Sequence, residues 1–432
     1  MADFTRPDVV HLLRRAGFGG TAAEVTALVA LPNWAAVVDR VLDTSANPAD
    51  TIPAAVDDDE DRYYPPWVAS VQYWLNRMAT TPTPIVEKMT LFWHGNLASS
   101  TDACLPRHMF RQIKTYRERA LGDVHDLLQA MAIDPAMLQY LNNASNVAAE
   151  PNENFARELM ELFTLGNGNF TEADVIGMAR AWTGYNYDDD GEQFIYRANK
   201  HDGAQKTIFG ITRAWTGPEA LTEIVRGSRQ QTCARYLATK IWSFFAYPAP
   251  AAALVDDLAA AFIASGMNVK ALLRAVFLRP EFRLATTRTA LVRSPIEFMV
   301  ATMRALKLDA ATMHPEWWLD PMGQNPYQPP NVSGWRQNAA WISTSAQWAK
   351  GSFAGWARWV ANDAGVFAGA GSLTPAAAAT AAFERFGIED PSPLTRKRIE
   401  EYVAREQAAN RTWAIPPNLV TITLLSPDFQ LA

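Results

Sequence analysis

The segment from Glu150 to Asn186 constrains the fold of this chain more than any other, because its residues recur at helical intervals. On a wheel of about 100° per residue, roughly one third of the circumference is polar. The polar residues are Asn154, Arg157, Glu158 and Glu161, and Phe155, Leu159, Leu162 and Phe163 lie opposite. A glycine turn and the capping-box spacing of Thr171 and Asp174 then start a second helix. The segment therefore predicts an amphipathic helix, a turn and a capped helix.

The same periodicity elsewhere predicts a mostly α fold, a single large multi-helical domain. Two segments depart from it. Residues 185–215 are aromatic and polar, which predicts a small non-helical or β excursion. Residues 308–345 are rich in proline and tryptophan and predict a long irregular loop, a type of segment that is more often functional than decorative. We expect both segments to meet near the face that carries Glu158 and Glu161.

Residues 1–365 are predicted to form the helical body. Residues 366–432 are expected to hold a flexible stretch rich in alanine and glycine, followed by C-terminal helices that pack on the body. The high apolar fraction of 49% agrees with a folded globular chain of this length.

The charge balance and the apolar runs narrow the possible partners. A net charge of -6 argues against a general nucleic-acid binder. No apolar run is long enough to predict a membrane span. The N-terminal sequence lacks the pattern of an export signal, so the chain as given is expected to be cytoplasmic, or exported if a signal was removed. Its two cysteines form no CxxC pair, which argues against a thiolate zinc site.

The carboxylates of the polar stripe are the first candidate site. Glu158 and Glu161 are three residues apart, a spacing at which two carboxylates can bind one metal or divide acid and base roles. Arg157 is included as a catalytic candidate and Asn154 as a substrate-binding one. The competing interpretation is a solvated face on which Arg157 pairs with Glu153 and Glu161.

Two histidines and two tryptophans complete the predicted site. His94 ends an apolar helix and could be a ligand, a base or a core residue. His201 and Asp202, with Lys206 nearby, could bind a metal or form an ordinary turn. The tentative set of metal ligands is His94, Glu158, Glu161, His201 and Asp202. Trp335 and Trp341 are expected to line a substrate groove, to which Lys206 would also contribute.

Several long motifs point to one family. They are HLLRRAGFG (11–19), KMTLFWHGN (88–96), PNENFARELMELFTLG (151–166), FTEADVIGMARAWTG (170–184), HDGAQKTIFG (201–210) and GQNPYQPPNVSGW (323–335). The chain resembles the bacterial family called domain of unknown function 1800, nearly from end to end. The resemblance implies that the polar motifs form a shared site, but it carries no established activity.

The resemblance also implies two points to check. Family members often read His-Asn-His where this chain has His94, Gly95 and Asn96, so a site that needs both imidazoles would lose a ligand here. Members are often exported and encoded beside a protein that resembles sulfatases and alkaline phosphatases, which would be a candidate partner.

Two functions compete at this point. One is a hydrolase or lyase with an acid/base or metal-assisted site of Glu158, Glu161, Arg157 and His94, acting on a polar, carbohydrate-like substrate. A divalent metal is the candidate cofactor. The other is a non-catalytic helical scaffold or partner-binding protein, in which the stripe is a buried hydrogen-bond network.

Overall fold

The helix α5 (Pro84–Asn96) lies in the middle of the molecule in the computed structural model, which describes residues 3–56, 64–188 and 193–432. All its residues from Ile85 to His94 are buried. Around it lie the other helices of the first part of the chain: α1 (Arg6–Arg15), α2 (Ala22–Val29), α3 (Trp34–Val41), α4 (Tyr64–Thr80) and α6 (Pro106–Arg119). A helix that is buried all round is a core element, so α5 organises its neighbours.

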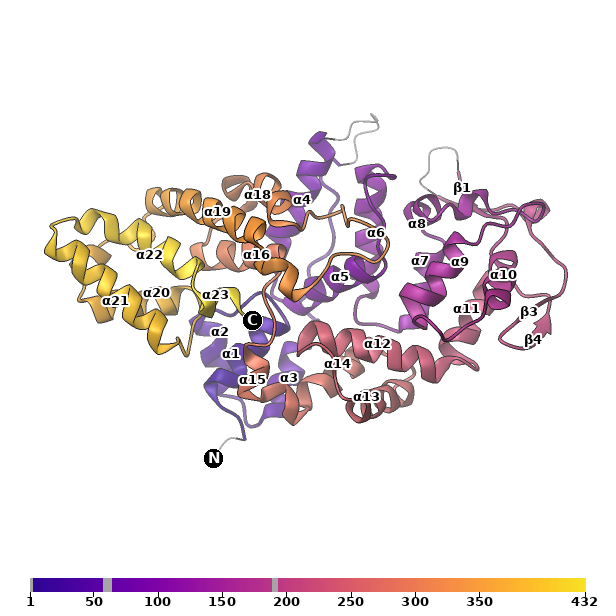
Figure 1. Cartoon of the computed structure of the whole chain (residues 1–432), viewed down its shortest axis with the longest axis horizontal. Coiled ribbons are helices and arrows are strands. Elements are labelled where there is room, and N and C mark those ends of the chain that lie inside the picture. Colours follow the sequence, from indigo (N-terminus) through magenta and orange to yellow (C-terminus); the bar gives the residue numbers. More distant parts are fainter. Residues whose placement is uncertain (1–2, 57–63, 189–192) are drawn as a thin grey trace.

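The next group of elements forms the right-hand end of Figure 1 and carries the predicted stripe. It contains α7 (Val124–Ala132), α8 (Pro135–Tyr140), η1 (Asn143–Ser145), α9 (Asn154–Glu158), η2 (Leu159–Thr164), α10 (Glu172–Ala181), η3 (Ala198–Lys200) and α11 (Gly217–Arg226). Thr171 caps α10 and forms the predicted capping box with Asp174.

Two antiparallel hairpins occupy the predicted β excursion. The first pairs β1 (Tyr185–Tyr187) with β2 (Phe194–Tyr196), and the second pairs β3 (Lys206–Ile208) with β4 (Ile211–Arg213). Their registers place Tyr185 opposite Tyr196 and Lys206 opposite Arg213. The predicted excursion from a helical body is confirmed.

The helices that follow in the chain lie below α5 and to its upper left in Figure 1. The lower group contains α12 (Gln230–Phe245), α13 (Ala252–Ala264), α14 (Val269–Leu278), η4 (Pro280–Arg283) and α15 (Ala285–Arg288). The upper group contains α16 (Pro295–Leu306), α17 (Ala310–Met313), α18 (Pro315–Met322), η5 (Asn338–Ile342) and α19 (Thr344–Asp363).

The segment 308–345 is less irregular than predicted, because α17, α18 and η5 lie inside it. Its coil is anchored to α5, since the backbone N–H of Tyr327 donates to His94 Nε2 at 3.1 Å. The hairpins lie at the far right-hand end of Figure 1. The two segments therefore do not meet at the Glu158 face, and that expectation was wrong.

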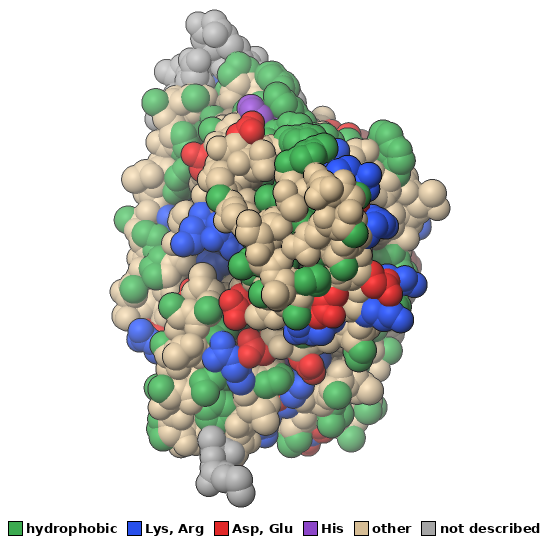
Figure 2. All heavy atoms as spheres, turned by 90° about the vertical axis from the view of Figure 1, so that its left-hand side faces the viewer, with side chains coloured by type: hydrophobic (Ala, Val, Ile, Leu, Met, Phe, Trp, Pro, Cys, Tyr) green, Lys and Arg blue, Asp and Glu red, His purple; other side chains and the backbone are tan. Residues whose placement is uncertain are grey.

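The C-terminal elements form the left-hand end of Figure 1: η6 (Ala370–Ser372), α20 (Pro375–Arg385), α21 (Pro393–Ala408), η7 (Thr412–Ala414), α22 (Ile415–Leu424) and α23 (Pro427–Gln430). Part of the stretch predicted as flexible forms α20, which buries Ala378, Ala379 and Ala382. Phe429 joins this end to the body through its ring contact with Phe298, at 5.5 Å between centroids. Figure 2 shows acidic and basic side chains interspersed over this end.

Within the described ranges, we find no helix that combines the length and apolarity needed to cross a membrane.

Candidate functional site

The polar stripe is interrupted by a π-helical turn. The α-helix α9 ends at Glu158, and η2 continues as a π-helix from Leu159 to Thr164. Arg157 binds two glutamates near the surface, Glu153 at 3.1 Å and Glu172 at 2.7 Å. Glu172 belongs to α10, so Arg157 joins two helices. The predicted pairing with Glu153 is present, but Glu172 takes the place expected for Glu161.

The two stripe carboxylates are half-buried. Burial, and then the charge of Glu161, raise the pKa of Glu158 above its ordinary value, against the opposing effect of Arg157. A carboxyl whose pKa is raised in this way can hold a proton closer to neutral pH. Asn154 is exposed, and its amide donates to the Leu141 carbonyl at 3.3 Å. It therefore caps a loop.

His94 is a buried residue between aromatic rings. Its side chain is fully buried, with ring centroids 5.7 Å from Trp74 and 5.1 Å from Trp335. Nε2 accepts the Tyr327 N–H, and Nδ1 has no hydrogen-bond partner among the described residues. Burial lowers the pKa of His94 to about 3, so the imidazole is neutral at physiological pH. Of the three predicted roles, this environment fits the core residue best.

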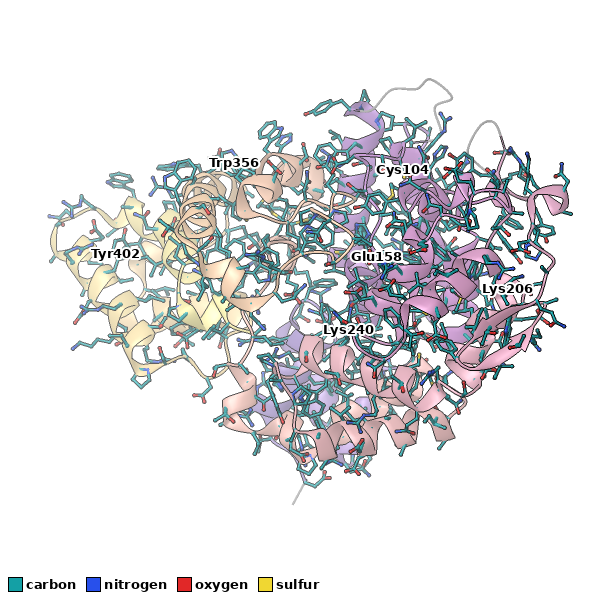
Figure 3. All side chains as sticks on the ribbon, turned by 45° about the vertical axis from the view of Figure 1, so that its right-hand side comes forward. Cys104, Glu158, Lys206, Lys240, Trp356 and Tyr402 are labelled. Atoms are coloured by element: carbon teal, nitrogen blue, oxygen red, sulfur yellow. The ribbon has the colours of Figure 1, made fainter. Side chains whose placement is uncertain are left out.

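His201, Asp202 and Lys206 stabilise the hairpin end of the molecule. His201 Nδ1 contacts the Thr183 carbonyl at 2.9 Å, and Asp202 accepts Arg180 Nε at 2.6 Å. Lys206 Nζ donates to the carbonyls of Asp202 and Trp215. Figure 3 places Lys206 well apart from Glu158 and Lys240. Lys206 therefore lies far from the stripe.

The predicted metal ligands are not gathered at one point. Over residues 3–56, 64–188 and 193–432, no group of three or more His, Cys, Asp and Glu side chains is arranged to hold a metal ion. His94 lies in an aromatic core, the stripe carboxylates lie on α9 and η2, and His201 and Asp202 lie at the hairpins. The set of five ligands thus does not form a single centre.

A pocket of about 330 Å³ opens beside α5, where several elements converge. Its lining includes Lys88, Phe92, Gly95 and Asn96, which follow one face of α5 at helical spacing. The remaining lining residues used below are Arg15 of α1, Lys240 of α12, Glu297 of α16, and Ser333, Trp335, Gln337 and Asn338 of the irregular segment. Arg15 and Lys88 are buried, whereas Ser333 and Gln337 are exposed. The pocket thus has a buried floor and a solvent-facing rim.

Lys88 and Glu297 form an ion pair in the floor. Lys88 is 3% exposed and also donates to the Gly17 carbonyl at 3.2 Å. Glu297 is held from the other side by the capping box of α16, in which the Ser294 N–H donates to its carboxylate at 2.7 Å. Burial acts to raise the pKa of Glu297, but Lys88 and Ser294 outweigh it and the pKa is lowered. The pair is therefore charged and fixed.

Arg15 brings an unneutralised cation to the same floor. One of its terminal nitrogens donates to the Thr287 carbonyl at 2.6 Å. Its Nε and Nη1 have no hydrogen-bond partner in the described part of the chain, although the residue is only 2% exposed. Burial lowers the pKa of Arg15 to about 9, even though Glu297 acts in the opposite direction. Two buried guanidinium nitrogens of Arg15 are thus without a hydrogen-bond partner in the described residues.

Lys240 reaches the pocket from α12 and joins it to the π-helical turn. Its ammonium donates to the Leu162 carbonyl at 3.0 Å, and the same carbonyl accepts the Tyr236 hydroxyl at 2.7 Å. Figure 3 shows Glu158 and Lys240 in the central part of the molecule, consistent with this contact. Burial lowers the pKa of Lys240 to about 8. The ammonium has further N–H groups to offer a ligand.

Trp335 is placed in the pocket wall by a close backbone contact. Gly334 has a φ of +75°, and a Cβ on it would lie 2.0 Å from the Gly95 carbonyl oxygen. Only glycine permits this approach, which brings the irregular segment onto the end of α5. Trp335, predicted to bind substrate, therefore lies beside His94 and lines the pocket. Trp341 is buried as well, and its carbonyl accepts a hydrogen bond from Lys350 Nζ at 3.0 Å.

The charged floor of the pocket is not evident from the sequence pattern alone. Arg15 and Lys88 lie inside motifs that were recognised, HLLRRAGFG and KMTLFWHGN. The available signal was a lysine within an otherwise apolar helix, because such a charge is buried only when it is paired or functional. Glu297 follows Ser294 at capping-box spacing. That spacing already gives Glu297 a structural role, so the sequence does not indicate its ion pair with Lys88. No pattern in the sequence around Lys240 indicates that it lines a pocket.

Comparison with known proteins identifies the family. The model of the family described as "Protein of unknown function (DUF1800)" matches residues 11–431. The chain therefore belongs to this family. No match was found among curated proteins or among solved structures.

Proposed function

We propose that this protein binds a small anionic ligand in the pocket between α1, α5, α12 and α16. The observation that carries the proposal is Arg15, whose buried guanidinium has two nitrogens, Nε and Nη1, without a hydrogen-bond partner in the described residues. A buried donor without a partner costs about 1–3 kcal/mol, and more when it is charged. Because Arg15 lines the pocket, an anion bound there would be attracted to this guanidinium.

The charges of the lining support the same conclusion. Arg15, Lys88 and Lys240 line the pocket, and Glu297 is the one acidic side chain among the described residues that line it. Since Glu297 is engaged by Lys88, two cations are left to attract a ligand. A guanidinium fork matches the geometry of carboxylates and phosphates, and an ammonium adds a point charge.

Titration with inorganic sulfate and inorganic phosphate, followed by calorimetry, tests the proposal. We expect saturable binding that Lys240→Gln weakens at least about tenfold, because a hydrogen bond to a charged group contributes about 1.5–3 kcal/mol. Arg15→Lys should also weaken binding, since it retains the charge and removes the fork. The matched control is Lys397→Gln, a lysine that is 68% exposed on α21.

Sulfate stabilises proteins in general by exclusion from their surfaces, so a rise in melting temperature alone is no evidence of binding. The ionic strength is therefore held constant with sodium chloride, and the heat of binding is the readout. Absence of saturable heat with both anions, or identical binding by the Lys240 variant, would contradict the proposal.

A second candidate is the hydrolase or lyase expected from the sequence, with Glu158 as the acid. The observation in its favour is the raised pKa of Glu158, caused by burial and by Glu161. Metal analysis of the purified protein and of a Glu158→Gln variant tests the metal-assisted form, because loss of bound metal would assign a ligand. A variant that loses folding without any bound metal would favour the scaffold alternative.

The partner that resembles sulfatases and alkaline phosphatases also stays a prediction. Co-purification with the neighbouring gene product would check it.

A further inference from the structure

We infer that the ligand of this pocket is an anionic monosaccharide, a sugar ring that bears one acidic group; this inference rests on the proposed anion binding. The first argument is size. The volume of about 330 Å³ corresponds to about ten waters at roughly 30 Å³ each. A tetrahedral inorganic anion would leave most of that space to solvent, whereas a single sugar ring would occupy it.

The second argument is the separation of the two kinds of lining. The buried cations Arg15 and Lys88 line one part of the pocket, and the wall also carries the indole of Trp335, which is 6% exposed and lies between the exposed residues Ser333 and Gln337 in the sequence. Ligand pockets commonly combine apolar aromatic surface with a few placed polar groups. The C–H groups of a sugar ring pack against aromatic surface, since an aromatic face is electron-rich. An acidic group can thus reach the floor while the ring contacts Trp335.

The third argument is that the pocket also offers hydrogen-bond acceptors. An inorganic oxyanion such as sulfate has no N–H or O–H group to donate to them. The Asn96 amide nitrogen donates to the Phe92 carbonyl at 2.8 Å, so its oxygen is the group available to a ligand. The Ser333 hydroxyl at the rim can accept as well as donate. Hydroxyl groups on the ligand would satisfy these acceptors. An ammonium would do so too, but the excess of cations disfavours a zwitterion such as an amino acid.

Calorimetry at constant ionic strength with four probes tests the inference: D-glucuronate, D-glucose 6-phosphate, D-glucose and sulfate. We expect at least one of the two acidic sugars to bind about tenfold more tightly than both D-glucose and sulfate. Comparison of the two acidic sugars shows whether a carboxylate or a phosphate supplies the charge.

A Trp335 variant separates the contribution of the sugar ring to affinity from that of the acidic group. Trp335→Ala should weaken binding of the acidic sugar about tenfold and weaken sulfate binding much less, because the indole would contact the sugar ring and not the charged group. Trp335→Phe retains an aromatic ring and should restore part of the affinity if the alanine variant folds poorly. The matched control is Trp359→Ala, a residue of α19 that is 47% exposed.

The outcomes distinguish the two proposals. If sulfate or D-glucose binds as tightly as both acidic sugars, the ligand is not an anionic monosaccharide. In that case, the sulfate measurement alone decides whether the pocket binds anions. If none of the charged probes binds, the proposed anion site itself is wrong.

Discussion

Two buried ionic clusters lie beside α5 on different faces of the helix, and they differ in how their charges are balanced. Adjacent residues of α5 enter them, Glu87 the first and Lys88 the second. Glu87 binds Arg77 at 2.6 Å and Arg117 at 2.9 Å, and Asp50 binds Arg117 at 2.7 Å. This cluster therefore contains two acids and two bases.

The cluster around Lys88 contains more bases than acids. Arg15 and Arg293 lie near the single carboxylate of Glu297, and each has an N–H without a partner in the described residues. No such nitrogen occurs on Arg77 or Arg117 within the same residues. A buried cluster that is neutral and satisfied stabilises packing. The excess positive charge beside the pocket is the feature on which the proposed anion binding depends.

Removal of one acid from the balanced cluster should have the largest effect. Glu87→Gln leaves two buried guanidinium groups with one carboxylate, so we expect the free energy of unfolding to fall by about 3–5 kcal/mol. Chemical denaturation measures this. The control is Arg274→Gln, which breaks an exposed pair with Asp39 and should change stability by less than about 1 kcal/mol. Equal losses in both variants would remove the distinction between the clusters.

Lowering the pH should reduce the stability of the fold through His94, whose ring lies between the two clusters. His94 lies between Trp74, which donates to Glu87, and Trp335 of the pocket. Burial lowers the pKa of His94 to about 3, against an ordinary value of 6.5. Below about pH 6.5 the unfolded chain binds a proton that the folded chain excludes, so stability falls as pH falls. The loss reaches about 2 kcal/mol at pH 5.

Denaturation of the wild type and of His94→Gln between pH 7 and pH 5 checks this slope. His11 acts in the same direction, since burial also lowers its pKa well below 6.5. The variant should therefore lose part of the slope and not all of it. An unchanged slope would show that the imidazole is solvated in the native state.

Neutralising Glu297, the acidic side chain among the described residues of the pocket lining, should strengthen anion binding. Glu297→Gln frees Lys88 from its partner, so we expect sulfate to bind about tenfold more tightly, the value of one charge-assisted hydrogen bond. Calorimetry measures the affinity. Weaker binding in this variant would mean that the ion pair shapes the site and does not compete with the ligand.

Alkaline pH should weaken anion binding. Burial lowers the pKa of Lys240 to about 8, so its charge is largely present at pH 7 and largely lost at pH 9. Affinity for sulfate should fall severalfold over that range. Lys240→Arg retains its charge at pH 9 and should flatten the profile up to about pH 8.5. Above that, Arg15 begins to contribute, since burial lowers its pKa to about 9.

The smallest effect is expected at the stripe. Arg157 is one third exposed and binds Glu153 and Glu172 near the surface. Arg157→Gln should reduce the free energy of unfolding by less than about 1 kcal/mol, because solvent screens exposed pairs. A loss comparable to that of Glu87→Gln would show that the stripe is a structural network.

Local signals predicted much of the fold. The capping box at Thr171, the glycine turn before it and the aromatic run 194–196 depend on neighbouring residues, and each appears as predicted. The helices inside 308–345 were missed because their prolines suggested loops. Pro315 opens α18 and Pro321 lies within it.

The site was harder to predict because it depends on contacts between distant residues. Glu172 rather than Glu161 completes the pairing of Arg157, and only the packing of α10 on α9 decides this. The sequence around His94 does not show whether its side chain faces a pocket or an aromatic core. The pocket floor joins residues of α1, α5 and α16, and no local pattern connects them.

The π-helical turn places a length constraint on the chain. The Leu162 carbonyl accepts both Tyr236 and Lys240. Deletion of one residue between Leu159 and Thr164 would restore α-helical spacing and turn that carbonyl by about 100°. Lys240 would then lose its anchor although no residue of the pocket had changed. Homologues that lack this extra residue should position the equivalent lysine differently, so the segment length can serve as a criterion for dividing the family.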